Sequence, residues 1–281
     1  MDIDESNKEI EAIKSALEAA NASTKRQVFE KFALAALGSI PWVGGFISAA
    51  ASFGAKSDGA AGKANNLQTR WLEEHQKKID RLMNTLNDVA SRFESLGDQI
   101  NERIQSEDYL SIVRKAFRTW DQADTAEKRQ YVANLISNSA GTNLCSDDVI
   151  RLFVDWLELY HEAHFAVIRE IYKHPSSTRH SIWQNIHGKF PRDNSAEADL
   201  FKRLIRDLTL DGVIRQEREV NHYGQFVKKD NHGRKGQSSS TMESPFEDTK
   251  SYELTELGKQ FVHYTMNEVV PRVGGMAAND R

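Results

Sequence analysis

The first residues that suggest catalytic chemistry are two histidines in the segment His161-Glu-Ala-His164. Zinc metalloproteases bind their metal through two histidines four residues apart on one face of a helix, with a glutamate as the base. The histidines here are three residues apart, so they do not form that motif and we expect them to have a structural role. The sequence also contains no Walker loop, no glycine-rich dinucleotide fingerprint and no nucleophile elbow. We therefore predict that the chain is not an enzyme and has no catalytic residue, metal, cofactor or small-molecule substrate.

Cysteine and the paired carboxylates add no sign of catalysis. Cys145 is the only cysteine, which excludes an internal disulfide bond and a cysteine-based zinc cluster and suits a reducing compartment. Asp147 and Asp148 stand at the expected start of a helix, where carboxylates interact favourably with the helix dipole. Glu73 and Glu74 fall on the flank of another predicted helix. We expect solvated roles for both pairs.

Phosphate binding is the chemistry that the basic residues of the C-terminal half suggest. A helix predicted to begin at Ser195 carries three basic residues, but nearly as much acidic charge, which makes it a poor reader of a DNA groove. Residues 221–250 hold a denser basic group, and a flexible basic loop contacts phosphates without reading base sequence. A solvated loop without a ligand is the alternative. The candidate ligand- or nucleic-acid-binding residues are Lys202, Arg203, Arg206, Lys228, Lys229, Arg234 and Lys235.

Overall composition limits the partners and the compartment. The 281 residues carry a formal net charge of −4, so the chain lacks the basic excess of a dedicated nucleic-acid-binding protein. Their number allows one large or two ordinary domains. Residues 1–31 predict an amphipathic helix that begins with acidic residues, unlike a secretory signal. We expect a cytoplasmic protein that associates with the inner membrane conditionally.

The elements expected around the basic residues change from helices to strands. Asp211-Gly212 ends a helical pattern, after which residues 213–220 alternate between apolar and polar side chains as a strand does. The expected elements are helices at 178–187, at 195–210 and from 255, and strands at 213–220 and 251–254. With a preceding helix, this is the element order of a winged helix-turn-helix.

The segments DLTLDGVIRQ and YELTELGKQFV resemble the corresponding parts of bacterial winged-helix proteins, including the MarR-like and PadR-like regulators. The resemblance covers about residues 162–266. It implies a C-terminal α+β winged-helix domain, residues 175–270, in which the third helix would enter the major groove and the wing would touch phosphates. Winged helices also serve as protein-interaction modules, so the resemblance is more specific for fold than for function.

An apolar run, residues 32–55, has no charged residue although 28% of the whole chain is charged. Its 24 residues are enough to cross a bilayer. Pro41 and the following Gly44-Gly45 favour a break into two short helices. The run is therefore either a hairpin buried in the fold, a segment that inserts into a membrane on demand, or a permanent anchor. The candidate membrane or pore residues are Leu37, Gly38, Ile40, Trp42, Gly44, Gly45, Phe46, Ala49 and Phe53.

A heptad pattern follows a flexible connector at residues 56–66. We expect one helix from Leu67 to about Ser106, within a helical region that extends to residue 145. This helix is either an arm of an intramolecular bundle or a seam for self-association. A further helix at 146–174 is expected to bridge to the winged-helix domain, and residues 271–281 form a tail. The candidate oligomer seam is Leu72, Ile79, Leu82, Leu86, Val89, Phe93, Leu96 and Ile100.

These features predict a mainly α protein, with an N-terminal helical bundle that contains a long heptad helix and a glycine-rich apolar segment, followed by a winged-helix domain. By architecture, the chain resembles the membrane-disrupting effectors of bacterial anti-phage defence, such as the Hailong-type channel effector. That resemblance implies a homo-oligomer, a bound DNA or oligonucleotide ligand and a pore in contact with membrane lipid. The alternatives are a soluble winged-helix DNA-binding regulator with a helical dimerisation region and a scaffold protein that uses its winged helix for protein contacts.

Overall fold

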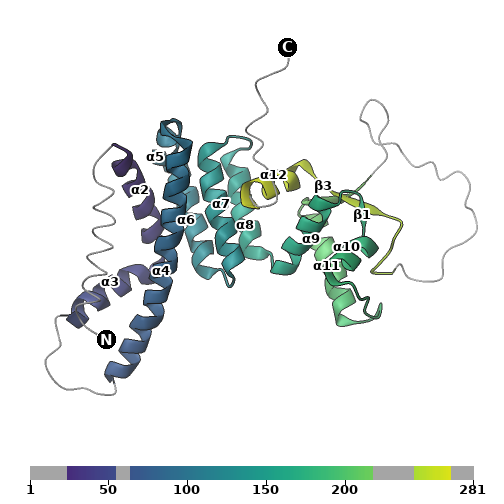
Figure 1. The fold of residues 1–281 in the computed structure, drawn as a ribbon, viewed down its shortest axis with the longest axis horizontal. Coiled ribbons are helices and arrows are strands. Elements are labelled where there is room, and N and C mark those ends of the chain that lie inside the picture. Colours follow the sequence, from purple (N-terminus) through teal and green to yellow (C-terminus); the bar gives the residue numbers. More distant parts are fainter. Residues whose placement is uncertain (1–23, 55–63, 218–243, 267–281) are drawn as a thin grey trace, which may run out of the picture. The chain divides into compact units, whose positions relative to one another are not determined.

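The computed structural model describes residues 24–54, 64–217 and 244–266. Within them the chain is mainly helical, as predicted, and has a small three-stranded antiparallel sheet (Figure 1). The chain divides into two compact units, with the boundary between Glu158 and Leu159. Unit 1 contains the helices before this boundary, and unit 2 contains the sheet and the helices after it. Residues 1–23, 55–63, 218–243 and 267–281 lie outside the described residues. They include most of the predicted N-terminal helix at 1–31 and of the predicted connector at 56–66, and all of the predicted tail at 271–281.

Unit 1 is built from helices whose starts follow from capping side chains. Ser106 and Thr125 precede two of them, and each side chain accepts a hydrogen bond from a backbone N–H of the first turn. The elements are α2 (Thr24–Gly38), α3 (Pro41–Gly54), α4 (Ala64–Leu96), η1 (Asp98–Ile100), α5 (Asn101–Gln105), α6 (Glu107–Gln122), α7 (Ala126–Gly141) and α8 (Asp147–Leu159).

The predicted helix from Leu67 to about Ser106 is wrong in its length. Helix α4 ends at Leu96, because Gly97 has a φ of 76°, a conformation that glycine adopts without a steric penalty. Short helices η1 and α5 then redirect the chain. The heptad side chains of α4 point into unit 1, where α4 packs on α7 and α3. Helices of the same unit cover this seam, and self-association through it stays a prediction. Leu96 is half-buried, and the side chain of Leu72 lies outside the described residues. The buried members of the seam are Ile79, Leu82, Leu86, Val89, Phe93 and Ile100.

Helix α7 lies at the centre of unit 1 and is buried around most of its circumference. It packs on both α4 and α6, so polar residues along it need partners within the protein. Asn134 accepts a hydrogen bond from Arg92 of α4 at 2.6 Å, and the Ser137 hydroxyl donates to a backbone carbonyl of the preceding turn. Burial with satisfied hydrogen bonds explains why a helix with little amphipathic pattern occupies the core.

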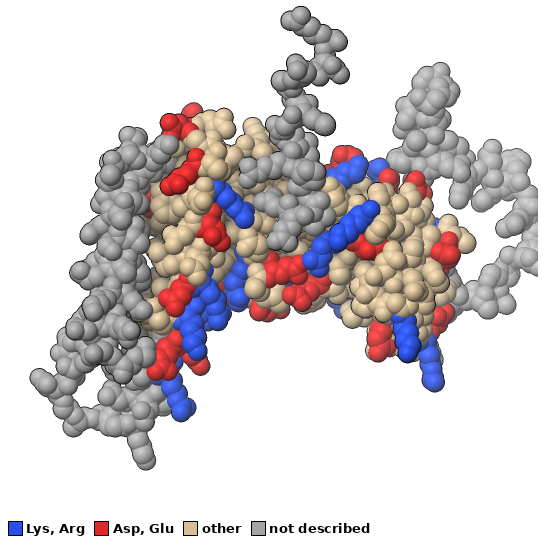
Figure 2. All heavy atoms as spheres, in the orientation of Figure 1, with Lys and Arg blue, Asp and Glu red and all other residues tan. Residues whose placement is uncertain are grey.

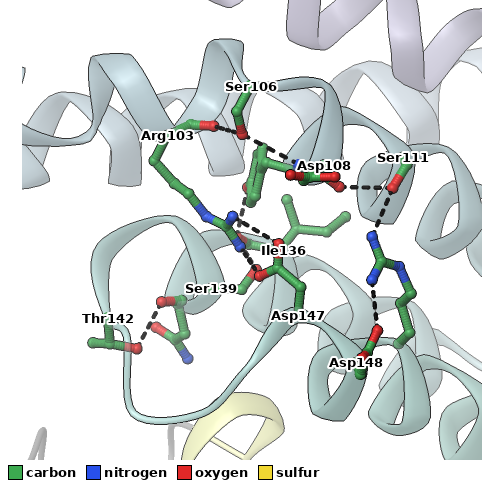
Figure 3. Close-up of polar contacts among 12 residues, drawn as sticks. Arg103, Ser106, Asp108, Ser111, Ile136, Ser139, Thr142, Asp147 and Asp148 are labelled. Atoms are coloured by element: carbon green, nitrogen blue, oxygen red, sulfur yellow. Dashed lines mark hydrogen bonds and ion pairs between the residues drawn. The ribbon is translucent and has the colours of Figure 1, made fainter.

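Arg103 and Asp147 join α5 to the start of α8 (Figure 3). The guanidinium binds both carboxylate oxygens, a bidentate geometry that is stronger than a single contact. The Arg103 guanidinium, through its hydrogen bond, holds the pKa of the Asp147 carboxyl below its usual value of 3.8. Beside this pair, the Tyr109 hydroxyl donates to the backbone carbonyl of Ile136 at 2.8 Å. These contacts join α5 to α8 and α6 to α7 within unit 1.

The predicted bridging helix at 146–174 is two helices. Helix α8 ends at Leu159 and α9 (Glu162–Lys173) begins after His161. The side chain of Tyr160 is fully buried in unit 2, and its hydroxyl donates to Asp211 at 2.8 Å. At the break, the backbone N–H of His161 donates to Nδ1 of His164 at 3.1 Å. The histidine pair therefore has the structural role that we expected, because it satisfies the backbone where the helix is interrupted.

Unit 2 continues with helices whose bounds agree closely with the sequence patterns. Thr178, Ser195 and Thr255 each accept a backbone hydrogen bond at the start of a helix. The strands β2 and β3 pair antiparallel, and β3 also pairs with a two-residue strand, β1, that the sequence did not reveal. The sheet order is β1-β3-β2. The elements after α9 are β1 (Ser177–Thr178), α10 (Arg179–His187), α11 (Ala196–Leu210), β2 (Ile214–Gln216), β3 (Ser251–Leu254) and α12 (Glu256–Thr265).

Candidate functional site

The apolar run folds as two helices that meet at nearly a right angle. Helix α2 ends at Gly38, α3 begins with Pro41 at its first position, and the two axes are bent by 93°. Proline is favoured at this position because the first turn of a helix leaves its N–H groups unpaired. We call residues 29–48 the apolar corner. It is a corner rather than the predicted hairpin.

The apolar corner also contains the single span candidate among the described residues. No individual helix there has both the length and the apolar character needed to cross a membrane. The helical segments Phe29–Gly38 and Pro41–Ser48 meet those two criteria when they are taken together as a bent pair.

The α2 arm of the corner is anchored by Phe32, whose side chain is completely buried. Its ring packs edge-on against Phe93 of α4, with 5.1 Å between centroids, and against Phe117 of α6, at 6.0 Å. Ala33 and Ala36 are buried on the same arm. This arm is therefore part of the core of unit 1.

The α3 arm is attached through Trp42, which binds two neighbouring helices. Its indole N–H donates to Asp121 at the end of α6 at 2.7 Å. His75 of α4 lies edge-on to the indole with 5.1 Å between centroids, and the Lys78 ammonium lies 5.6 Å from the centre of the ring. We call Trp42 with Asp121 the indole latch. Sequence analysis identified Trp42 but missed Asp121, since nothing in a sequence marks a hydrogen bond across 79 positions.

The outer surface of the corner combines glycine with exposed aliphatic side chains. Gly38, Gly44 and Gly45 are exposed, and a Cβ added at any of them would meet no atom within 4 Å. None has the positive φ that requires glycine. Leu34 and Ile47 are 58% and 51% exposed. Packing among the described residues of unit 1 therefore does not explain why glycine occupies the interior of α3.

The predicted membrane residues are thus distributed between two environments. Ile40 and Phe46 are buried, while Leu37 and Trp42 are half-buried. The three glycines lie on the outer surface described above. Ala49 and Phe53 belong to α3, but their side chains lie outside the described residues. The structure brings the described members onto one corner with an inner and an outer face.

In unit 2, the predicted basic residues of α11 are exposed. Lys202 and Arg206 project to solvent, and the Arg203 guanidinium lies 3.3 Å from the Asp207 carboxylate on the next turn. On the visible face of the molecule, basic and acidic side chains are interspersed, with no extended basic area (Figure 2). The loop candidates Lys228, Lys229, Arg234 and Lys235 lie outside the described residues.

A hollow of about 550 Å³ lies between the start of α9 and the length of α11. Its floor holds His164, whose Nε2 is 3.9 Å from Asp207. Burial lowers the pKa of His164 from its usual value of 6.5, although Asp207 opposes the shift. Burial, together with the hydrogen bond to Asp211, raises the pKa of Tyr160. The lining residues are Leu159, Tyr160, His161, Ala163, His164, Leu200, Arg203, Leu204, Asp207, Leu210 and Asp211.

The described residues contain no group of three histidine, cysteine or carboxylate side chains placed to hold a metal ion. Comparison with known proteins adds no assignment: no family model, curated protein or solved structure matches the chain.

Proposed function

We propose that the chain is a membrane-active bacterial effector that holds its apolar corner against unit 1 until a signal at unit 2 releases it. The observation that carries this proposal is the pair of exposed glycines, Gly44 and Gly45, inside an uncharged helix. Each glycine costs a helix interior about 1 kcal/mol relative to alanine. Among the described residues, no close contact requires glycine at either position.

Close approach of helices is the physical reason for such residues in membranes. Lipid gives no hydrophobic force between helices, so transmembrane helices associate through small residues that let two backbones come near each other. In the proposed open state, α3 of one copy would pack against another copy through Gly44 and Gly45. The assembled corners would then form a pore, and homo-oligomerisation is part of this proposal.

The proposed sensor is unit 2, which we interpret as a winged helix-turn-helix. The order α9, β1, α10, α11, β2, β3, α12 and the sheet order β1-β3-β2 support this interpretation. Lys202 and Arg206, one turn apart on the exposed side of α11, would contact the phosphates of an oligonucleotide ligand. With the resemblance to anti-phage channel effectors, these features favour a role in bacterial defence.

Dye release from liposomes tests the effector proposal directly. Gly45→Glu adds a charge where a Cβ has open space, so unit 1 should fold normally while insertion into lipid becomes unfavourable. We expect the wild-type chain to release dye once activated and Gly45→Glu to release none, with unchanged circular dichroism. Equal release by both proteins would contradict the proposal. Asn87→Glu, which adds the same charge at an exposed position of α4 outside the corner, is the matched control.

The indole latch gives a second test, in the opposite direction. Trp42→Phe keeps an aromatic ring beside His75 but removes the hydrogen bond to Asp121, which contributes about 1.5–3 kcal/mol when the acceptor is charged. We expect spontaneous dye release to rise at least about tenfold, the shift that 1.4 kcal/mol produces. Asp121→Ala should have the same effect, and the double variant should add little to either single one. Additive effects would show that the two side chains do not act as one latch.

A soluble DNA-binding regulator is the second candidate, and the element order of unit 2 favours it. Two features of α11 count against major-groove reading: the acidic first turn, with Glu197 and Asp199, and the exposed Leu200. A regulator would bind duplex DNA with an affinity that falls steeply with salt and would not affect liposomes. Fluorescence anisotropy with a labelled duplex at two salt concentrations distinguishes this function from the first.

A further inference from the structure

One exposed side of α11 has a regular pattern that neither the core of unit 2 nor the proposed ligand site uses. Leu200, Arg203, Asp207 and Leu210 follow one another at spacings of three, four and three residues, so they lie along one stripe of the helix. We call these four residues the α11 stripe. Leu200 is 53% exposed and Leu210 is 72% exposed. Leucines at both ends of an exposed stripe indicate a contact surface.

The α11 stripe is complementary to itself when it is reversed. We propose that α11 pairs antiparallel with α11 of a second copy of the chain, about a two-fold axis that passes beside position 205. Leu200 then faces Leu210 of the second copy, and Arg203 faces Asp207 of the second copy. A two-fold axis repeats each contact, which gives two leucine pairs outside two ion pairs.

The charges of the stripe decide the direction and the occupant. A parallel pair of α11 helices would place Arg203 opposite Arg203 and Asp207 opposite Asp207, and like charges in contact are unfavourable. A DNA groove would bury Leu200 and Leu210 against phosphates and bring Asp207 near them. Of these three arrangements, the antiparallel pair alone gives each leucine of the stripe a leucine partner and each charged residue a partner of opposite charge.

The hollow beside α11 has room for a side chain of the second copy. It runs along the stripe on the side of α9, and Leu159, 62% exposed, extends its apolar lining. A side chain of the second copy would enter this hollow as a knob enters a hole. Lys202 and Arg206 lie on the flank of α11, roughly 100° around the helix from the centre of the stripe, and stay exposed in the pair.

Cysteine cross-linking tests both the pairing and its direction in the full-length chain. Cys145→Ser removes the native thiol and serves as the background. The variants are Leu200→Cys alone, Leu210→Cys alone, and an equimolar mixture of the two. In the antiparallel pair, each position 200 lies beside position 210 of the other copy, but two positions 200 are ten residues, or about 15 Å, apart along the axis.

Under mild oxidation we expect the mixture to form a disulfide-linked heterodimer and the single variants to stay largely monomeric. A disulfide needs Cα atoms about 4.4–6.8 Å apart, which the single variants do not provide. Homodimers from either single variant at the same rate would indicate a parallel pair and overturn the proposal. No covalent dimer in any sample, at concentrations up to those of crystallisation, would overturn it as well.

Sedimentation velocity of charge variants gives an independent readout without a covalent bond. One helix stripe is smaller than a standard protein interface of about 800 Å² per partner, so dimerisation should be weak and dependent on concentration. Arg203→Asp should raise the dimer dissociation constant about tenfold or more, because it opposes two carboxylates. The swap Arg203→Asp with Asp207→Arg should restore it, and Lys202→Glu on the flank should leave it unchanged. A swap as weak as the single variant would contradict the pairing. Because these readouts need no membrane, they are independent of the proposed effector function.

Discussion

Replacing Gly44 and Gly45 together by alanine separates the two explanations for the apolar corner. In the closed structure, an added Cβ at either position meets no atom within 4 Å, and neither residue has a positive φ. The substitutions therefore cost no contact and remove the helix penalty of glycine, about 1 kcal/mol each. We expect the double variant to be more stable than the wild type by about 2 kcal/mol, which raises the melting temperature by about 4–8 °C in a unit of 150–250 residues.

The same variant should be a poor effector. Added methyl groups separate the backbones that we propose to approach each other, so they weaken the open assembly. The gain in helix propensity is shared by the closed and open states, because α3 is helical in both, and does not shift the balance between them. Liposome dye release should therefore fall well below the wild-type level through the lost helix contact alone. Ser48→Ala is the matched control, because it increases helix propensity by about 0.5 kcal/mol on the same helix and adds no bulk.

Two results would refute this reasoning. A double variant with a lower melting temperature would show that α3 is not packed as described. A stabilised variant that releases dye as fast as Ser48→Ala would show that the glycines are not a contact surface, and the corner would then be an ordinary part of the core.

Three further predictions concern stability. Gly258→Ala should destabilise unit 2 by several kcal/mol, because the Cβ of the alanine would lie 2.1 Å from the backbone oxygen of Val213. Chemical denaturation followed by tryptophan fluorescence measures this loss. An unchanged denaturation midpoint would contradict the close approach of the two backbones. Arg103→Ala should destabilise unit 1 by about 1–2 kcal/mol, and Arg103→Lys should recover only part of the loss because one contact to Asp147 remains. Full recovery by lysine in urea titrations would show that the second contact adds nothing to stability. The unfolding free energy of unit 2 should fall as the pH drops below 6.5, because His164 binds a proton in the unfolded chain while its lowered pKa keeps it neutral in the folded one. Urea titrations at pH 7.5 and 5.5 measure this fall, which should be smaller for His164→Asn.

Local signals in the sequence predicted most element boundaries. Thr178, Ser195 and Thr255 are capping residues whose hydrogen bonds join neighbours in the chain, so their effect is visible from the sequence alone. Asp211-Gly212 likewise ended its helix at the predicted position, with Gly212 at a φ of 75°. The two-residue strand β1 was missed because it is too short to show any periodicity.

Contacts between distant residues account for the errors. The heptad pattern continues past Gly97 to Ile100, although α4 ends at Leu96, whose side chain packs against Gly141 of α7. The predicted helix at 146–174 breaks at Tyr160, whose side chain is buried in unit 2 and donates a hydrogen bond to Asp211. The exposed outer face of the corner could not be predicted either, since sequence alone does not show which helices cover the other side.

The right-angled corner also sets a length. The two arms of the corner are ten and eight residues long, and neither alone could reach across a hydrocarbon layer of about 30 Å. Made collinear, the 20 residues from Phe29 to Ser48 would extend about 30 Å at 1.5 Å per residue. The backbone angles of Ser39 and Ile40, between the arms, separate these two shapes. If the corner straightened at Ser39 and Ile40 alone, its length would match the hydrocarbon thickness of a bilayer.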